Sequence, residues 1–315
     1  MRKTTLLVTL LLFSFLAACS EQVTPEQEAT LVAEVVEPAE VPATETTEAL
    51  MAEPAQVPTE DPATKQPATI TPEQISLDTQ GLPYSWQAVT VPEQPYDESR
   101  PPGPKGLPEH IQILFGVSDP VDREPLTPVM YLIPVDAYQE MWEAAGNDSV
   151  SNTINAIREI AFTMDRPADS SGLPALPWEE VSGVNDLAVQ FDRAVPAGQA
   201  NETSATQNGY RFIGRWAQDA NPVTNENLRY VYQGFTNDGK YLVSFWYPVT
   251  SSQIADEPSA EAIEQVNNDV NAYLTSEAEW LDALATTDWE PDLATLDALV
   301  ASLEIDGMVS AASQE

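Results

Sequence analysis

The chain of 315 residues has few side chains suited to nucleophilic or metal chemistry. It contains one cysteine, Cys19, and one histidine, His110. A zinc site with the usual cysteine and histidine ligands needs more of either. A Ser–His–Asp arrangement would have to use His110, and no G-x-S-x-G motif supplies its serine. No G-x-G-x-x-G or P-loop pattern occurs, so nucleotide binding has no support in the sequence.

Carboxylates are the abundant reactive groups, with 50 Asp and Glu against 13 Lys and Arg. Two of them could form an acid/base pair of the kind that glycoside hydrolases use. Glu179, Glu180, Asp192 and Asp219 lie near expected strand ends or loops, where functional sites often occur. We interpret each as a solvated surface charge, and an extracytoplasmic hydrolase that works through carboxylates remains an alternative.

The loop at residues 219–227 is rich in side-chain oxygens, which Ca²⁺ prefers as ligands. Asp219, Asn221, Asn225 and Glu226 are its candidate ligands for calcium or for another polar ligand. The loop lacks the spacing of an EF-hand and has no glycine. Asn and Asp also form turns and cap strands, so a purely structural role is the alternative.

Aromatic side chains on the expected strands offer a second kind of site. Trp216, Tyr232, Trp246 and Tyr247 could form a platform on which a sugar ring stacks. Alternating aromatic residues more often pack in a core. The platform interpretation therefore requires at least two of the four to lie exposed together.

The chemistry of Cys19 depends on the segment that precedes it. Arg2 and Lys3 are followed by residues 6–18, which are apolar apart from Thr9 and Ser14. This is the layout of a secretory signal, and the apolar run is too short to span a membrane as a helix. An ordinary cleaved signal next to a chance cysteine is one interpretation of it.

The run Leu16-Ala17-Ala18-Cys19 resembles the lipobox of bacterial lipoproteins. The resemblance implies diacylglyceryl transfer to the sulfur of Cys19 and cleavage between Ala18 and Cys19. It also implies lipid anchoring on the extracytoplasmic face of the cell membrane or the outer membrane. A lipid on Cys19 would leave no cysteine for a disulfide within the chain, so the core would have to stabilise the fold.

Residues 20–80 differ from the rest of the chain in composition. They contain eight prolines, thirteen Asp or Glu and one basic residue, Lys65, with no aromatic residue and no glycine. Such a segment cannot bury enough apolar area to offset its ordering entropy. We therefore expect a signal peptide at 1–18, a lipidated, disordered acidic tether at 19–81, one folded domain at 82–306 and a disordered tail at 307–315.

The formal net charge of −37 restricts the kinds of partner that the protein can bind. A surface this acidic repels nucleic acid and anionic headgroups. We therefore expect no nucleic-acid partner, and expect the membrane to be reached only through the lipid on Cys19. Attraction of cations is compatible with this charge, and an unknown partner in the envelope or outside the cell is expected.

Hydrophobic periodicity predicts the elements that would carry these residues. Alternation at period two predicts strands at 110–117, 129–133, 187–192, 210–216, 228–235 and 241–247. The loop Thr236-Asn237-Asp238-Gly239-Lys240 predicts a hairpin between the last two strands, joined by 210–217 as a meander. We expect His110 at an exposed strand end, on the face opposite Ile111 and Ile113.

Helix signals lie between and after these strands. Asp136 and Ser149 are expected to begin two helices, Pro258-Ser259 a long one and Asp292 the last. The fold class is therefore α+β, a mainly antiparallel sheet with a C-terminal hairpin meander covered by helices.

Two further resemblances follow from short runs. Gly209-Tyr210-Arg211-Phe212, residues 225–230 and 233–241, and Pro248-Val249 resemble a domain of uncharacterised bacterial lipoproteins, which implies no activity. Residues 299–305 are similar to the last helix of PsbP-like α/β/α sandwiches. Together with the missing catalytic motifs, these features favour a membrane-anchored lipoprotein that presents a non-catalytic binding or structural domain. The alternatives are the hydrolase and a solute-binding lipoprotein of a transporter.

Overall fold

The computed structural model describes residues 70–100, 103–167, 172–194 and 204–308. All of them belong to one compact unit of the chain, 64–315. Cys19, the signal segment, the tether up to residue 69 and the tail from residue 309 lie outside the described residues. Within the described part, no helix is both long enough and apolar enough to span a bilayer.

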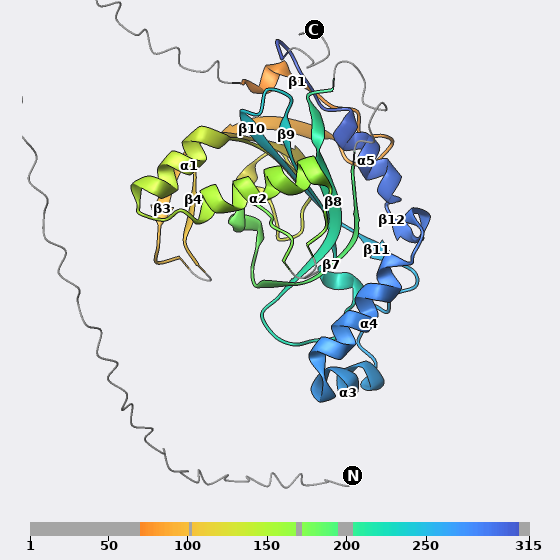
Figure 1. The fold of residues 1–315 in the computed structure, drawn as a ribbon. Helices are drawn as coiled ribbons and strands as arrows, with labels where there is room; N and C mark the ends of the chain where they lie inside the picture. Colours follow the sequence, from red (N-terminus) through yellow and green to blue (C-terminus); the bar gives the residue numbers. More distant parts are fainter. Residues whose placement is uncertain (1–69, 101–102, 168–171, 195–203, 309–315) are drawn as a thin grey trace, which may run out of the picture. The chain divides into compact units, whose positions relative to one another are not determined.

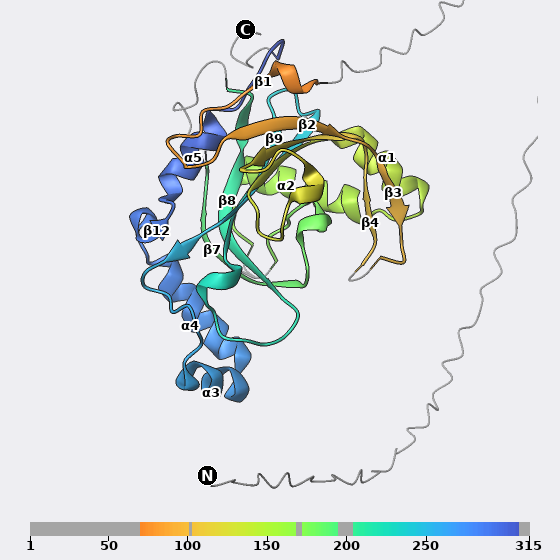
Figure 2. The ribbon, with the colours of Figure 1, turned by 180° about the vertical axis from the view of Figure 1, so that it is seen from behind.

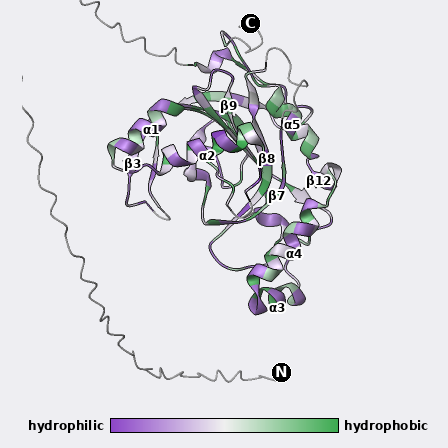
Figure 3. Ribbon diagram, in the orientation of Figure 1, coloured by the Kyte–Doolittle hydropathy of each residue, from purple (hydrophilic) through white to green (hydrophobic). Residues whose placement is uncertain are grey.

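The centre of the fold is an antiparallel sheet of seven strands in the order β2-β5-β6-β10-β9-β8-β7 (Figure 1). Each strand has side chains on two faces, and both faces are buried in the middle of the sheet. In Figure 3 the central strands carry mostly hydrophobic residues. The strands are β2 (Trp86–Val91), β5 (His110–Phe115), β6 (Val129–Pro134), β7 (Val184–Asp192), β8 (Thr206–Ala217), β9 (Arg229–Thr236) and β10 (Tyr241–Pro248).

The predicted meander is confirmed, because β8 pairs with β9 and β9 with β10. The turn between β9 and β10 forms as its sequence predicts. Gly239 has a φ of 72°, which glycine adopts without strain. Asp238 accepts hydrogen bonds from the Thr236 hydroxyl and the Lys240 amide, and so holds the turn closed.

Helices cover both faces of the sheet (Figures 1 and 2). The first two helices pack on one face, over Leu114, Tyr131 and Trp246. The last two pack on the other, over Ile113, Phe245 and neighbouring residues. The α+β class with an antiparallel sheet is as predicted. The helices are α1 (Val135–Ala144), α2 (Ser149–Thr163), α3 (Ala260–Asn268), α4 (Val270–Asp282) and α5 (Leu293–Ala301).

The described part of the domain begins before the predicted boundary at Leu82. Strand β1 (Ile75–Ser76) pairs with β13 (Glu304–Ile305), and Ile70, Ile75 and Leu77 are buried. The predicted end of the tether at residue 81 is therefore wrong. Residues 70–80 share the lack of aromatic residues and glycine with the tether, so their composition alone assigns them to it. Strand β13 and the core supply the apolar contacts that these residues cannot make locally. The other short pairs are β3 (Gln94–Asp97) with β4 (Lys105–Leu107), and β11 (Thr250–Ser251) with β12 (Trp289–Glu290).

The expected long helix after Ser259 is two helices. Asp269 has a φ of −159°, which is extended backbone, and it lies between α3 and α4. Its side chain accepts a hydrogen bond from the Ala272 amide, so it caps the start of α4. Ser259, Asp292 and Ser149 lie at helix starts as predicted, whereas α1 begins one residue before Asp136.

Candidate functional site

An irregular segment, residues 173–181, crosses the sheet face that α1 and α2 also cover, and we call it the strap. Its attachment depends on a row of polar side chains across neighbouring strands. The strand registers place them side by side, in the order Gln112, Tyr131, Ser244, Gln233 and Tyr210. Polar groups buried in a sheet need partners, and the backbone of the strap supplies most of them.

Gln233 makes the central attachment of the strap. Its amide oxygen accepts from the Leu176 N–H at 3.1 Å, and its amide nitrogen donates to the Leu176 carbonyl at 3.0 Å. Ser244 donates to the same carbonyl, and Tyr210 donates to the Pro174 carbonyl at 2.7 Å. The sheet therefore holds the strap at defined points, which fixes the residues that follow Pro177.

The last part of the strap, η3 (Trp178–Glu180), contains two of the predicted candidate carboxylates. The Glu180 side chain is 5% exposed and contacts Arg123 and Arg229. Tyr131 donates to its Oε1 at 2.5 Å. Glu180 is thus a buried charge with two cationic partners, and its expected place on the solvated surface is wrong. Its charge is tolerated in the core because the arginines compensate for the lost water.

Glu179 lies beside Glu180 in a different environment. Its Oε1 accepts from the Gly106 amide at 3.1 Å, and its Oε2 is buried with no hydrogen-bond partner among the described residues. Burial raises the pKa of Glu179 above its usual value. It is therefore not the solvated charge that the sequence predicts.

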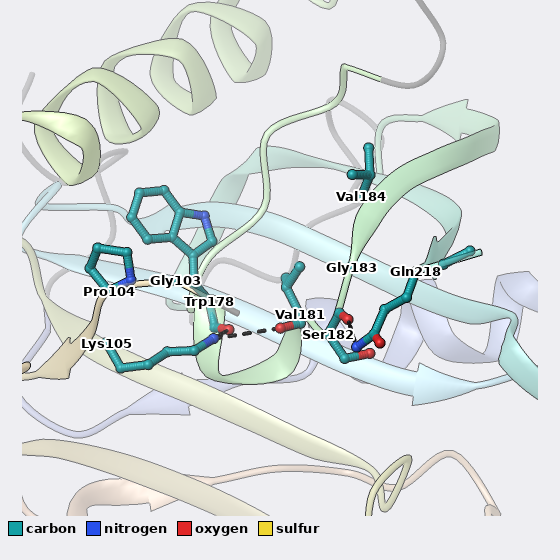
Figure 4. Close-up of a pocket in the computed structure, with 10 residues that line it drawn as sticks. Gly103, Pro104, Lys105, Trp178, Val181, Ser182, Gly183, Val184 and Gln218 are labelled. Carbon is teal, nitrogen blue, oxygen red and sulfur yellow. Dashed lines mark hydrogen bonds between the residues drawn. The ribbon is translucent and has the colours of Figure 1, made fainter. Parts of the chain in front are cut away.

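Trp178 and the residues around it line an open hollow of about 520 Å³, which we call the Trp178 hollow (Figure 4). The Trp178 indole is fixed from behind by Trp142, with ring centroids 4.9 Å apart. At the opposite side Val184 is 72% exposed, which is unusual for a strand valine. The hollow is lined by Gly103, Pro104, Lys105, Trp178, Val181, Ser182, Gly183, Val184, Ala217 and Gln218.

Lys105 is the one cationic side chain among the described residues lining the Trp178 hollow. Its ammonium donates to the carbonyls of Trp178 and Val181. Burial lowers the pKa of Lys105. The walls of the hollow also include the apolar groups of Pro104, Trp178, Val181 and Val184, with the polar residues Ser182 and Gln218 at one side (Figure 4).

A second hollow of about 300 Å³ contains three of the four predicted polar-site residues, and we call it the Trp216 hollow. Asp219, Asn221 and Glu226 line it, and their side chains have no hydrogen-bond or ion-pair partner within the described part of the chain. Its complete lining is Arg215, Trp216, Ala217, Gln218, Asp219, Asn221, Pro222, Thr224, Glu226, Asn227 and Pro258.

The two hollows are neighbours. Ala217, the last residue of β8, and Gln218 line both of them. The Gln218 side chain donates to the Ser182 carbonyl at 2.6 Å, which fixes the boundary between the hollows. One surface at the end of β8 therefore presents an apolar hollow beside a polar one with free carboxylates.

The predicted aromatic platform does not form. Tyr232, Trp246 and Tyr247 are at most 4% exposed, and only Trp216 is partly exposed and lines a hollow. The platform prediction is wrong for the three buried residues because helices and the strap cover both faces of the sheet. They pack in the core, with the Trp216 and Trp246 ring centroids 5.0 Å apart.

Asn225 is the fourth predicted polar-site residue, and its side chain is occupied. Its amide nitrogen donates to the carbonyls of Ser251 and Ile254 and to Asp256, and its oxygen accepts from the Ser251 amide. Asn225 therefore braces the end of β11 and the turn that follows it, and its side chain is not free to bind calcium. In the described ranges, no group of three or more His, Cys, Asp or Glu is arranged to hold a metal ion.

His110 is 2% exposed, so the prediction of an exposed strand end is wrong. It does lie on the face opposite Ile111, but that face is covered as well. Its Nδ1 is 2.8 Å from the Pro108 carbonyl and its Nε2 is 3.1 Å from Gln112. Burial lowers the pKa of His110, which favours the neutral ring.

Of the remaining candidate carboxylates, Asp192 is largely exposed at 3.8 Å from Arg211. Sequence reasoning missed Lys105, Trp178 and Val184, which come from three separate segments. Lys105 had one available signal, as one of only 13 basic residues in an acidic chain. Comparison with protein-family models, with curated proteins and with solved structures found no match, so the resemblances stay predictions.

Proposed function

We propose that this protein is an exported, lipid-anchored lipoprotein whose folded domain binds a partner outside the cytoplasm without catalysing a reaction on it. The lipobox-like run ending at Cys19 supports the anchor. The single observation that carries the binding role is the pair of adjacent hollows at the end of β8. They combine apolar walls with unpartnered polar side chains, which is the usual composition of a ligand site.

The contacts of Glu180 support binding rather than catalysis. Glu180 is paired with Arg123 and Arg229 and lines neither hollow. An acid/base group needs to reach a proton on its substrate, and the contacts of Glu180 are all within the protein. Its cluster therefore serves to hold the strap, and through it Trp178, in place.

A thermal-shift screen on the full-length protein in detergent tests this proposal. Pools of peptides, glycans and small solutes are added to the native protein and to Val184→Glu, which places a charge on the apolar hollow. Val121→Glu is the matched control, because Val121 is 89% exposed and lines neither hollow.

At least one pool should raise the melting temperature of the native protein and of Val121→Glu, but not of Val184→Glu. The same pools are examined by mass spectrometry for cleaved products. A screen in which no pool acts, in which Val184→Glu responds like the control, or in which a pool component is consumed would contradict the proposal.

A further inference from the structure

We propose that the two hollows together bind one peptide segment, with a large apolar side chain in the Trp178 hollow and a lysine or arginine in the Trp216 hollow. The inference rests on the proposed binding function and gives it a ligand class. It follows from the different chemistry of the two hollows and from their shared boundary at Ala217 and Gln218.

The Trp178 hollow fits an apolar side chain. Its walls include the Trp178 indole and the side chains of Pro104, Val181 and Val184. Burial of Val184, now 72% exposed, and of the indole face would be favourable. The indole needs no rearrangement to take part, because Trp142 already holds it.

The Trp216 hollow fits a cation. Asp219 and Glu226 line it without a partner in the described part of the chain. Arg215 also lines it but does not neutralise them, because Asp186 pairs with it at 2.9 Å and 2.5 Å. The other donors of Arg215 face the carbonyls of Asn221 and Pro222. A guanidinium or ammonium near the Trp216 indole can also gain from its ring electrons.

Charge also sets which side chain enters which hollow. The Lys105 ammonium borders the apolar hollow and opposes a second cation there. The carboxylates disfavour an acidic side chain in the other hollow, and the net charge of −37 attracts a basic partner over a longer range. The arrangement therefore selects both the ligand class and the hollow that each of its side chains enters.

The proximity of the hollows favours a peptide over separate ligands. Two consecutive residues, Ala217 and Gln218, form their common boundary. An extended chain rises about 3.3 Å per residue and every second side chain points to the same face, so side chains on next-neighbouring residues can reach adjacent hollows. Joining the two groups in one chain makes the second contact intramolecular and strengthens binding.

Calorimetric titration of the full-length protein in detergent tests the inference with defined peptides. Each is acetylated and amidated, and has Trp and Arg separated by zero, one or two glycines. The reference peptides replace Arg by Gln or Trp by Ala. The best Trp and Arg peptide should bind at least tenfold more tightly than its Gln counterpart, and raising the salt concentration should reduce that difference.

Variants test which hollow binds the Arg side chain of the peptide and which binds the Trp side chain. Asp219→Asn with Glu226→Gln should abolish the tenfold advantage of Arg and leave binding of the Gln peptide unchanged. The matched control, Glu261→Gln with Glu264→Gln on α3, removes the same charge from an exposed surface and should keep most of that advantage. Val184→Glu should weaken binding of the Trp peptides but not reverse the effect of Arg.

The inference is overturned if no peptide binds at millimolar concentration, or if the advantage of Arg survives the double amide variant. In the first case the thermal-shift screen separates two failures. If a pool of another ligand class raises the melting temperature of the native protein but not of Val184→Glu, the binding function stands and only a peptide is excluded as its ligand. If no pool acts, both proposals fall.

Discussion

The Tyr230 hydroxyl donates to Asp297 Oδ1 at 2.8 Å, beneath α5 on the face of the sheet. Arg211 Nε lies 3.5 Å from the same oxygen, and Asp192 is the next acidic group around Arg211. Burial is the largest influence on Asp297 and raises its pKa to about 6, although Arg211 and the Tyr230 hydrogen bond act in the opposite direction.

This raised pKa predicts a stability that falls as pH rises. The folded state binds the Asp297 proton more tightly than the unfolded state, whose pKa is near 3.8. The contribution is therefore fully present below about pH 4 and is lost as the pH rises through about 6. Between pH 4 and 6 the native protein should lose on the order of 2–3 kcal/mol of unfolding free energy through this group, as measured by urea denaturation. Asp297→Asn should lack this loss.

Glu179→Gln is the control for this pH dependence, because burial raises the pKa of Glu179 in the same direction. The slope that remains in Asp297→Asn should become smaller when both substitutions are combined. An unchanged slope between pH 4 and 6 in Asp297→Asn would show that another group carries the dependence.

Glu180 predicts a large loss of stability on substitution. Glu180→Gln leaves Arg123 and Arg229 without their buried anion. Removing one partner from a buried ion pair costs about 3–5 kcal/mol. Tyr131→Phe removes only the hydroxyl that donates to Glu180 and accepts from Arg123, and should cost about 1.5–3 kcal/mol. Urea denaturation measures both, and equal losses would contradict the central role of the charge.

Substitution of Gln233 should weaken the attachment of the strap without altering the β9–β10 hairpin. Gln233→Leu leaves the Leu176 N–H without its partner and removes one donor to the Leu176 carbonyl. Each buried unsatisfied group costs about 1–3 kcal/mol. Gln253→Leu, at an exposed position, is the control and should be nearly neutral. Faster amide hydrogen exchange at Leu176 in Gln233→Leu only is the diagnostic result.

Gly183 and Gly103 both line the Trp178 hollow, but they differ in the space that is available for a side chain. A Cβ on Gly183 would lie 2.4 Å from the Ala217 carbonyl oxygen, whereas a Cβ on Gly103 meets nothing within 4 Å. Gly183→Ala must therefore displace the β7–β8 pairing and should cost about 1–3 kcal/mol. Gly103→Ala should be close to neutral in urea denaturation. Equal stability of the two variants would mean that the backbone there yields freely.

We expect a lipid on Cys19 to attach the protein to the membrane. Cys19→Ala removes the sulfur that would carry the lipid, so the variant should leave the detergent phase in phase partitioning. The native mature protein should show a diacylglyceryl mass on an amino terminus at Cys19. An unmodified start at another residue, or a Cys19→Ala protein that stays in the detergent phase, would exclude the anchor.

Local patterns were sufficient for most of the elements and insufficient for the site. Alternation in β8, β9 and β10 and the Asp238-Gly239 turn depend on neighbouring residues, and these predictions are confirmed. The loop at residues 219–227 was also a useful signal, because Asp219, Asn221 and Glu226 meet in one hollow. Alternation alone did not reveal that both sheet faces are covered, so it left an exposed platform with Tyr232 and Trp246 open and placed His110 at an exposed strand end.

The sequence by itself determined six of the seven strands of the main sheet, with β2 missed, as well as the main hairpin, most helix starts and the α+β class, because these follow from periodicity, capping and turn chemistry within a few residues. Only the tertiary structure decided that β1 joins the domain through β13, that Glu180 is a buried ion-pair centre, and that Lys105, Trp178 and Val184 meet Ala217. These contacts join residues far apart in the chain. No local pattern encodes them, because each depends on how the sheet, the strap and the helices pack together.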